Sequence, residues 1–154
     1  MTRRAVPDFH RILVAVASVA ATVPAACTTR SAAPMPRVDI QRGWARISDS
    51  GGTSGAYMNI VNNDTVPITL VGVSTADAGA AEVHETMQHE GVVQMMPRTE
   101  LRMAVGEVVT MAPGGLHVML VDVRRSLAVG DSVQLRLQFS DSTSVAIAVP
   151  VKTP

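Results

Sequence analysis

The chain of 154 residues has few of the side chains on which catalytic and redox sites depend. Its single cysteine, Cys27, excludes an internal disulfide. Aromatic residues make up only 3% of the sequence. The motifs G-x-S-x-G and H-E-x-x-H are absent, as are the glycine-rich fingerprints of phosphate and dinucleotide sites. These absences argue against an enzyme.

Positive charge is also scarce in the body of the sequence. The chain has 13 basic and 13 acidic side chains, of which three arginines and one aspartate precede Cys27, so the remainder carries 10 − 12 = −2. Its one lysine is Lys152. A weakly acidic domain does not bind a phosphate backbone well, and we expect no nucleic-acid partner.

Residues 1–27 have the plan of a bacterial export signal: basic residues, an apolar run over 12–23, and small residues before Cys27. The order Pro24-Ala25-Ala26-Cys27 resembles a lipoprotein signal, in which the cysteine is lipidated and becomes the mature N-terminus. Cleavage after Ala25 or Ala26 by the ordinary signal peptidase is the competing interpretation. A free thiol is a liability in an oxidising envelope, which favours lipidation. We expect a location in the bacterial periplasm or cell envelope, with membrane contact only through a lipid at Cys27.

The remaining sequence predicts a short tether and one domain. Residues 28–37 are small, polar and proline-bearing, as is typical of a tether, and the domain covers 38–152. Within it, β-rich runs alternate with turn signals at about the 8 to 12 residue spacing of a sandwich, without helical periodicity. We predict an all-β Greek-key sandwich with strands at 40–47, 55–61, 68–74, 82–87, 92–96, 108–111, 117–121, 132–139 and 145–151.

Histidine and methionine are concentrated between residues 84 and 119, which hold three of the four histidines and six of the nine methionines. After a turn at Pro113-Gly114, His117 and Met119 are two residues apart, so in a strand they share one face. If the runs 82–87 and 92–96 form a hairpin that turns at His89-Glu90, His84 lies opposite Met95. Two imidazoles and two thioethers form a soft, uncharged set of donors that selects Cu(I) over zinc, calcium or magnesium.

The spacing of His84, Met95, His117 and Met119 is H-x10-M-x21-H-x-M, which resembles the signature of the PCuAC family of periplasmic copper chaperones. The segments GWAR at 43–46 and GAYMNIVNND at 55–64 resemble the opening strands of that family. The resemblance covers roughly residues 38 to 151. Met96 differs, because the family usually has arginine before the proline.

The resemblance implies a cupredoxin-like sandwich that binds Cu(I) at an exposed site formed by His84, Met95, His117 and Met119. It also implies delivery of copper toward the CuA site of cytochrome c oxidase, often together with a Sco-type protein. A copper-buffering or resistance protein of the envelope would use the same ligands and is the alternative function. A blue-copper electron carrier is disfavoured because its site needs a cysteine thiolate. A structural or adhesion sandwich without a metal is a further alternative.

The other chemistry-bearing residues of this region have simpler interpretations. We expect the remaining methionines to be packing residues; this set comprises Met87, Met96, Met103 and Met111. Met87 and Met96 are predicted to face away from His84 and Met95, and the alternative for either is a position at the rim of the site, where it assists transfer. His89 is predicted at the hairpin tip and exposed to solvent, with a secondary copper contact as the alternative. Trp44 and Tyr57 are predicted to be core or interface aromatics.

Overall fold

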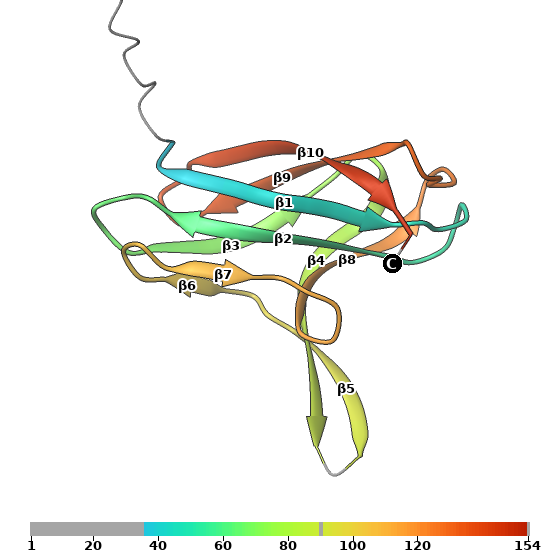
Figure 1. Cartoon of the computed structure of the whole chain (residues 1–154), viewed down its shortest axis with the longest axis horizontal. Helices are drawn as coiled ribbons and strands as arrows, with labels where there is room; N and C mark the ends of the chain where they lie inside the picture. The colour runs from blue at the N-terminus through green and yellow to red at the C-terminus, as the bar shows by residue number, and fades with distance from the viewer. Residues whose placement is uncertain (1–35, 90, 154) are drawn as a thin grey trace, which may run out of the picture. The chain divides into compact units, whose positions relative to one another are not determined.

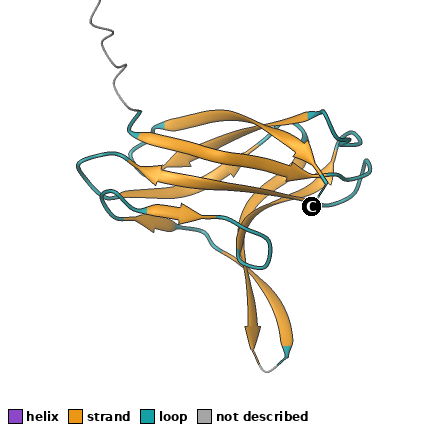
Figure 2. Cartoon of the chain, in the orientation of Figure 1, coloured by secondary structure: helices purple, strands orange, loops and turns teal. Residues whose placement is uncertain are grey.

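The computed structural model describes residues 36–89 and 91–153. The predicted export signal, Cys27 and residues 28–35 of the predicted tether lie outside this range. Over the described residues the chain forms ten strands and no helix, and so no helix that crosses a membrane (Figures 1 and 2). The strands are β1 (Val38–Arg46), β2 (Ser54–Asn62), β3 (Ile68–Ser74), β4 (Ala78–His89), β5 (Val92–Pro97), β6 (Leu101–Met103), β7 (Val108–Thr110), β8 (Leu116–Val123), β9 (Ser132–Phe139) and β10 (Ser144–Lys152).

The predicted all-β Greek-key sandwich is confirmed. Each of the nine predicted strands is present, and β6 is an additional short strand that was not predicted. The strand predicted at 82–87 is longer than expected, since β4 runs from Ala78 to His89. Pairing follows the order β5-β4-β8-β2-β1-β10-β9-β3-β6, with β7 paired to β2. Strands β1 and β10 are parallel, and the other pairs are antiparallel.

The apolar core explains why the strands adopt this arrangement. In β9, buried and exposed residues alternate strictly, and Val133, Leu135, Leu137 and Phe139 point inward. They join buried side chains from β2, β8 and β10 in one cluster. Burial of this apolar surface is the main driving force for the fold.

Strand β8 places the candidate site on the side of its sheet that faces away from this core. Val118 and Leu120 are fully buried in the core cluster. Because side chains alternate along a strand, His117 and Met119 emerge on the opposite face. The predicted shared face of these two residues therefore fits the period of the strand.

Strands β4 and β5 form a hairpin whose distal end extends beyond the rest of the sheet (Figure 1). Its register differs from the prediction: Met95 lies opposite Thr86, and His84 lies opposite Pro97. The predicted turn at His89-Glu90 was wrong because β4 continues through His89 and β5 begins at Val92. Gly91 takes the positive φ of 80° that the connection between the strands needs. The centre of this turn lies one residue later than predicted, so the pairing register differs by two residues.

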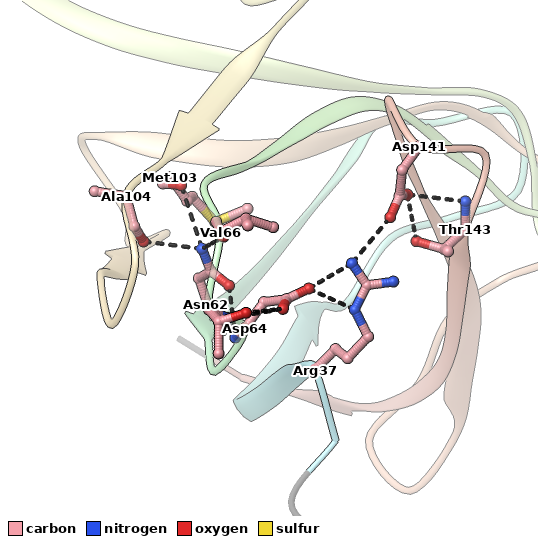
Figure 3. A network of polar contacts seen from close by, with 9 residues as sticks. Arg37, Asn62, Asp64, Val66, Met103, Ala104, Asp141 and Thr143 are labelled. Carbon is pink, nitrogen blue, oxygen red and sulfur yellow. Dashed lines mark hydrogen bonds and ion pairs between the residues drawn. The ribbon is translucent and has the colours of Figure 1, made fainter.

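A network of polar contacts connects residues near the ends of several strands (Figure 3). The buried amide of Asn62 donates to the carbonyl oxygens of Val66 and Ala104 at 3.0 and 2.9 Å. Asp64 is adjacent and forms an ion pair with Arg37, which also contacts Asp141 at 3.2 Å. The two bonds of Asn62 satisfy a buried amide that would be costly without partners.

Candidate metal centre

Three neighbouring strands bring the four predicted ligands to one face. His84 in β4 is directly opposite His117 in β8, and their ring centres are 6.1 Å apart. Met119 lies opposite Glu82, which makes it a diagonal neighbour of His84. Met95 is the diagonal neighbour of His84 on the other side, across the β4–β5 pair. His84 is thus the centre of the group.

The separation of the two imidazoles suits a shared ion. An imidazole nitrogen binds a metal at about 2.0 Å, so the centres of two rings that share one ion lie within roughly 6.5 Å of each other. The observed 6.1 Å falls inside that limit. Diagonal neighbours in a sheet remain within reach of long side chains such as methionine.

His117 is held in a defined orientation by the loop before β8. Its Nδ1 donates to the carbonyl oxygen of Gly115 at 3.0 Å, since a carbonyl only accepts. The turn that precedes it depends on Gly114, whose φ of 81° is unfavourable for other residues. His117 is 8% exposed. With Nδ1 carrying the proton, Nε2 has the free lone pair that a metal requires.

His84 has the opposite tautomer. Its Nε2 lies 2.9 Å from Oε2 of Glu82, and an ionised carboxylate only accepts, so Nε2 is the donor. Nδ1 therefore has the lone pair. That atom is buried and has no hydrogen-bond partner within the described residues. A buried polar atom without a partner is costly and needs an explanation, and a metal ion at this position supplies one.

The two thioethers differ in exposure. Met95 is 57% exposed on the hairpin, whereas Met119 is partly buried opposite Gly55. Both border a cleft of ≈ 430 Å³ that also includes Thr86 and His117. One sulfur is thus open to an approaching partner, while the other is anchored on the sheet.

Aromatic rings form the wall of the site beside His117. The ring centre of Tyr57 is 6.3 Å from that of His117 and 4.6 Å from that of Trp44. A Cβ atom at Gly55 would come within 2.7 Å of the Tyr57 hydroxyl, so glycine leaves the room that Tyr57 occupies. Tyr57 is buried, as the prediction of a core or interface aromatic allows, although it lies outside the core cluster; its contact with His117 was not predicted.

Glu82 was also missed, although its position two residues before His84 places both on one face of a strand. The other methionines divide into two groups. Met103 and Met111 are buried, as the packing interpretation predicted, but Met87 and Met96 are 43% and 48% exposed, so that interpretation is wrong for them. The register confirms that Met87 and Met96 face away from His84 and Met95.

Among residues 36–89 and 91–153, no group of three or more His, Cys, Asp or Glu side chains is arranged to hold a metal. The other donors on the face of His84 and His117 are the thioethers of Met95 and Met119. Uncharged thioethers favour soft monovalent ions. Fold and site together define the class: an all-β sandwich with a candidate soft-metal site on an outer sheet face.

Comparison with known proteins agrees with this class. The chain belongs to the LpqE-like family, described as "Putative lipoprotein LpqE-like", whose model matches residues 38–151. It is 30% identical over 116 residues to Lxx21020 of Leifsonia xyli subsp. xyli, which has the same lipoprotein description; the match covers 75% of this chain and 69% of that protein. It is 29% identical over 113 residues to RP573 of Rickettsia prowazekii, covering 70% of this chain and 62% of that protein.

Solved structures of PCuAC domains share the fold. The copper-bound PCuAC domain from PmoF2 is 28% identical, with a TM-score of 0.64 over 79% of this chain and 97% of that domain. The Cu(I) form of DR1885 from Deinococcus radiodurans is 28% identical, with a TM-score of 0.54 over 74% of this chain and 78% of that protein. The predicted family is confirmed, and it is a family of copper-binding chaperones rather than of enzymes.

Proposed function

We propose that this protein is an extracytoplasmic Cu(I) chaperone whose ligands are His84, Met95, His117 and Met119. The observation that carries the proposal is the placement of all four residues on one face of three neighbouring strands, with His84 between the others. Nδ1 of His84 is buried and has no hydrogen-bond partner among the described residues, which leaves its lone pair for a metal. The copper-bound PmoF2 domain and the Cu(I) form of DR1885 support the choice of metal. Copper is the cargo of this protein, held without catalysis.

The side chains have distinct tasks. His84 binds through Nδ1 and His117 through Nε2, because Glu82 and Gly115 occupy the other nitrogens. Each hydrogen bond fixes the orientation of its ring and makes the free nitrogen a stronger donor. The thioethers need no deprotonation. Protons therefore compete with the ion only for the nitrogens of the two imidazoles.

Release proceeds by ligand exchange and begins at the exposed sulfur. Met95, on the protruding hairpin, leaves first and opens a coordination position to a donor from the acceptor protein. His117 is almost buried and leaves last. The ion is therefore never free in solution, and the protein keeps a rigid sheet beneath it throughout.

Competition with a Cu(I) chelator at one equivalent of copper tests the ligand assignment. The wild-type chain is expected to retain the ion at chelator concentrations that strip the His117→Ala/Met119→Ala variant. Glu85→Ala is the control, because Glu85 lies one residue from His84 on the other face of β4 and pairs with Arg98. Equal retention by the wild type and the double variant would overturn the assignment.

We propose the CuA site of cytochrome c oxidase as the destination, with a Sco-type protein as an intermediary. The exposed Met95 supports transfer to a protein acceptor, since a storage site gains nothing from an open ligand. NMR of an isotope-labelled apo CuA domain mixed with the Cu(I)-loaded chain is the test. Transfer supports delivery; retention of copper by this chain supports the alternative, a copper-buffering or resistance protein of the envelope.

We also propose that the chain is exported to the periplasm or cell envelope and lipid-anchored at Cys27. The lipoprotein description of its family supports this. Cell fractionation of the wild type and a Cys27→Ser variant is the test: the wild type is expected in the membrane fraction. If Cys27→Ser leaves the membrane fraction unchanged, the anchor is not a lipid at this cysteine.

A further inference from the structure

The face of the β4–β5 hairpin opposite the candidate metal centre carries a second pair of thioethers. Met87 lies opposite Gln94, and Met96 lies opposite Glu85, so the two methionines are diagonal neighbours. They share a face because opposed residues in an antiparallel pair point to the same side. Neither belongs to the set proposed above.

The exposure of these residues distinguishes them from packing methionines. Met58, Met103 and Met111 are at most 3% exposed in the core, whereas Met87 and Met96 are 43% and 48% exposed. A long apolar side chain gains nothing in stability from such a position. Two thioethers that project from a protruding strand pair are instead available to bind an ion from solution.

The geometry of the pair suits one shared ion. Diagonal neighbours have Cα atoms about 7 to 8 Å apart. Each methionine sulfur lies two bonds beyond Cβ, so both sulfurs can approach a common ion at the roughly 2.3 Å of a metal–sulfur bond. The positive charge of Arg98 on this face is compensated, because its Nε lies 2.9 Å from the carboxylate of Glu85.

We propose that Met87 and Met96 form a second, weaker binding site for a soft monovalent cation, Cu(I) or Ag(I). The pair offers two thioethers, fewer donors than the four of the main site, so it holds the ion less tightly. It exists independently of the ligand set proposed for the main site. Its position on the same hairpin as Met95 gives it a role in capturing ions.

Titration of the chain with Ag(I), a redox-stable probe for soft sites, tests this proposal by NMR of ¹³C-methyl methionine. After the first equivalent, the methyl signals of Met87 and Met96 are expected to shift together, and that of buried Met58 to stay in place. The Met87→Leu variant is expected to lose the shift of Met96. The Met87 and Met96 shifts are also expected in the His117→Ala/Met119→Ala variant. This comparison distinguishes failure of this site from failure of the main one.

Two results would overturn the second site. The first is that the Met87 and Met96 methyl signals do not move at any excess of Ag(I). The second is that Met96 shifts as strongly in Met87→Leu as in the wild type, because each thioether would then bind alone. Leucine preserves the volume and apolar character of methionine, so the fold is retained in the variant.

Discussion

Removal of the Glu82 carboxylate is predicted to weaken Cu(I) binding although Glu82 is not a proposed ligand. Its Oε2 accepts from Nε2 of His84 at 2.9 Å and so keeps the lone pair on Nδ1. In Glu82→Ala the ring is free to change tautomer or rotate. Loss of such a supporting partner typically costs 10- to 100-fold in metal affinity.

The exposure of Glu82 sets the expected size of the effect within that range. Its side chain is 55% exposed, so water competes for the hydrogen bond and the loss falls near the lower limit, about tenfold or about 1.4 kcal/mol. Glu82→Gln keeps an accepting oxygen without the charge. Hydrogen bonds to charged groups are roughly twice as strong as neutral ones, so about half the free energy is lost, or roughly threefold in affinity.

Chelator competition for Cu(I) measures these affinities, with Glu85→Ala as the control. Glu85 is a carboxylate of the same strand that faces the other way and pairs with Arg98. The expected order of affinity is wild type and Glu85→Ala together, then Glu82→Gln, then Glu82→Ala. Wild-type affinity in Glu82→Ala would refute the tautomer assignment of His84.

Three further changes have defined outcomes. Met95→Leu should weaken Cu(I) binding by at least about tenfold in the same competition assay, yet leave the urea midpoint unchanged, since this side chain is mostly exposed; a lowered midpoint would mean that Met95 is structural. Gly55→Ala should destabilise the fold by about 1 to 3 kcal/mol in urea unfolding, because its Cβ would meet the Tyr57 hydroxyl at 2.7 Å; an unchanged midpoint would contradict the packing. The hydrogen bond from Arg37 lowers the pKa of Asp64. The stability that this pair contributes is therefore present above the unfolded pKa of about 3.9 and is lost as pH falls through the folded pKa. Arg37→Gln should therefore be less stable than the wild type at pH near 7 and approach it near pH 3, and a gap that stays constant across this range would contradict the assignment.

The sequence predicted the elements that depend on local patterns. The alternation in β9 predicted a half-buried strand, and its buried and exposed residues alternate as expected. The same rule placed His117 and Met119 on one face and Met87 and Met96 on the other. These inferences need only the period of two that every strand has.

The features that the sequence did not predict depend on contacts between distant segments. The hairpin register rests on the connection at Gly91, where a change of one residue in the turn centre moves Met95 from opposite His84 to opposite Thr86. The exposure of Met87 follows from how far β4 and β5 extend beyond the sheet. That Nδ1 of His84 has no hydrogen-bond partner among the described residues is apparent only once its surroundings are known.

Copper K-edge X-ray absorption of the chain loaded with less than one equivalent of Cu(I) tests the central proposal most directly. The four proposed ligands are expected to give a coordination shell that contains both imidazole nitrogen and thioether sulfur, with sulfur at roughly 2.3 Å. The sulfur contribution is expected to be smaller in Met95→Leu, because one of the two thioethers is gone. A shell of nitrogen and oxygen alone, or a spectrum that Met95→Leu leaves unchanged, would contradict the assignment of His84, Met95, His117 and Met119.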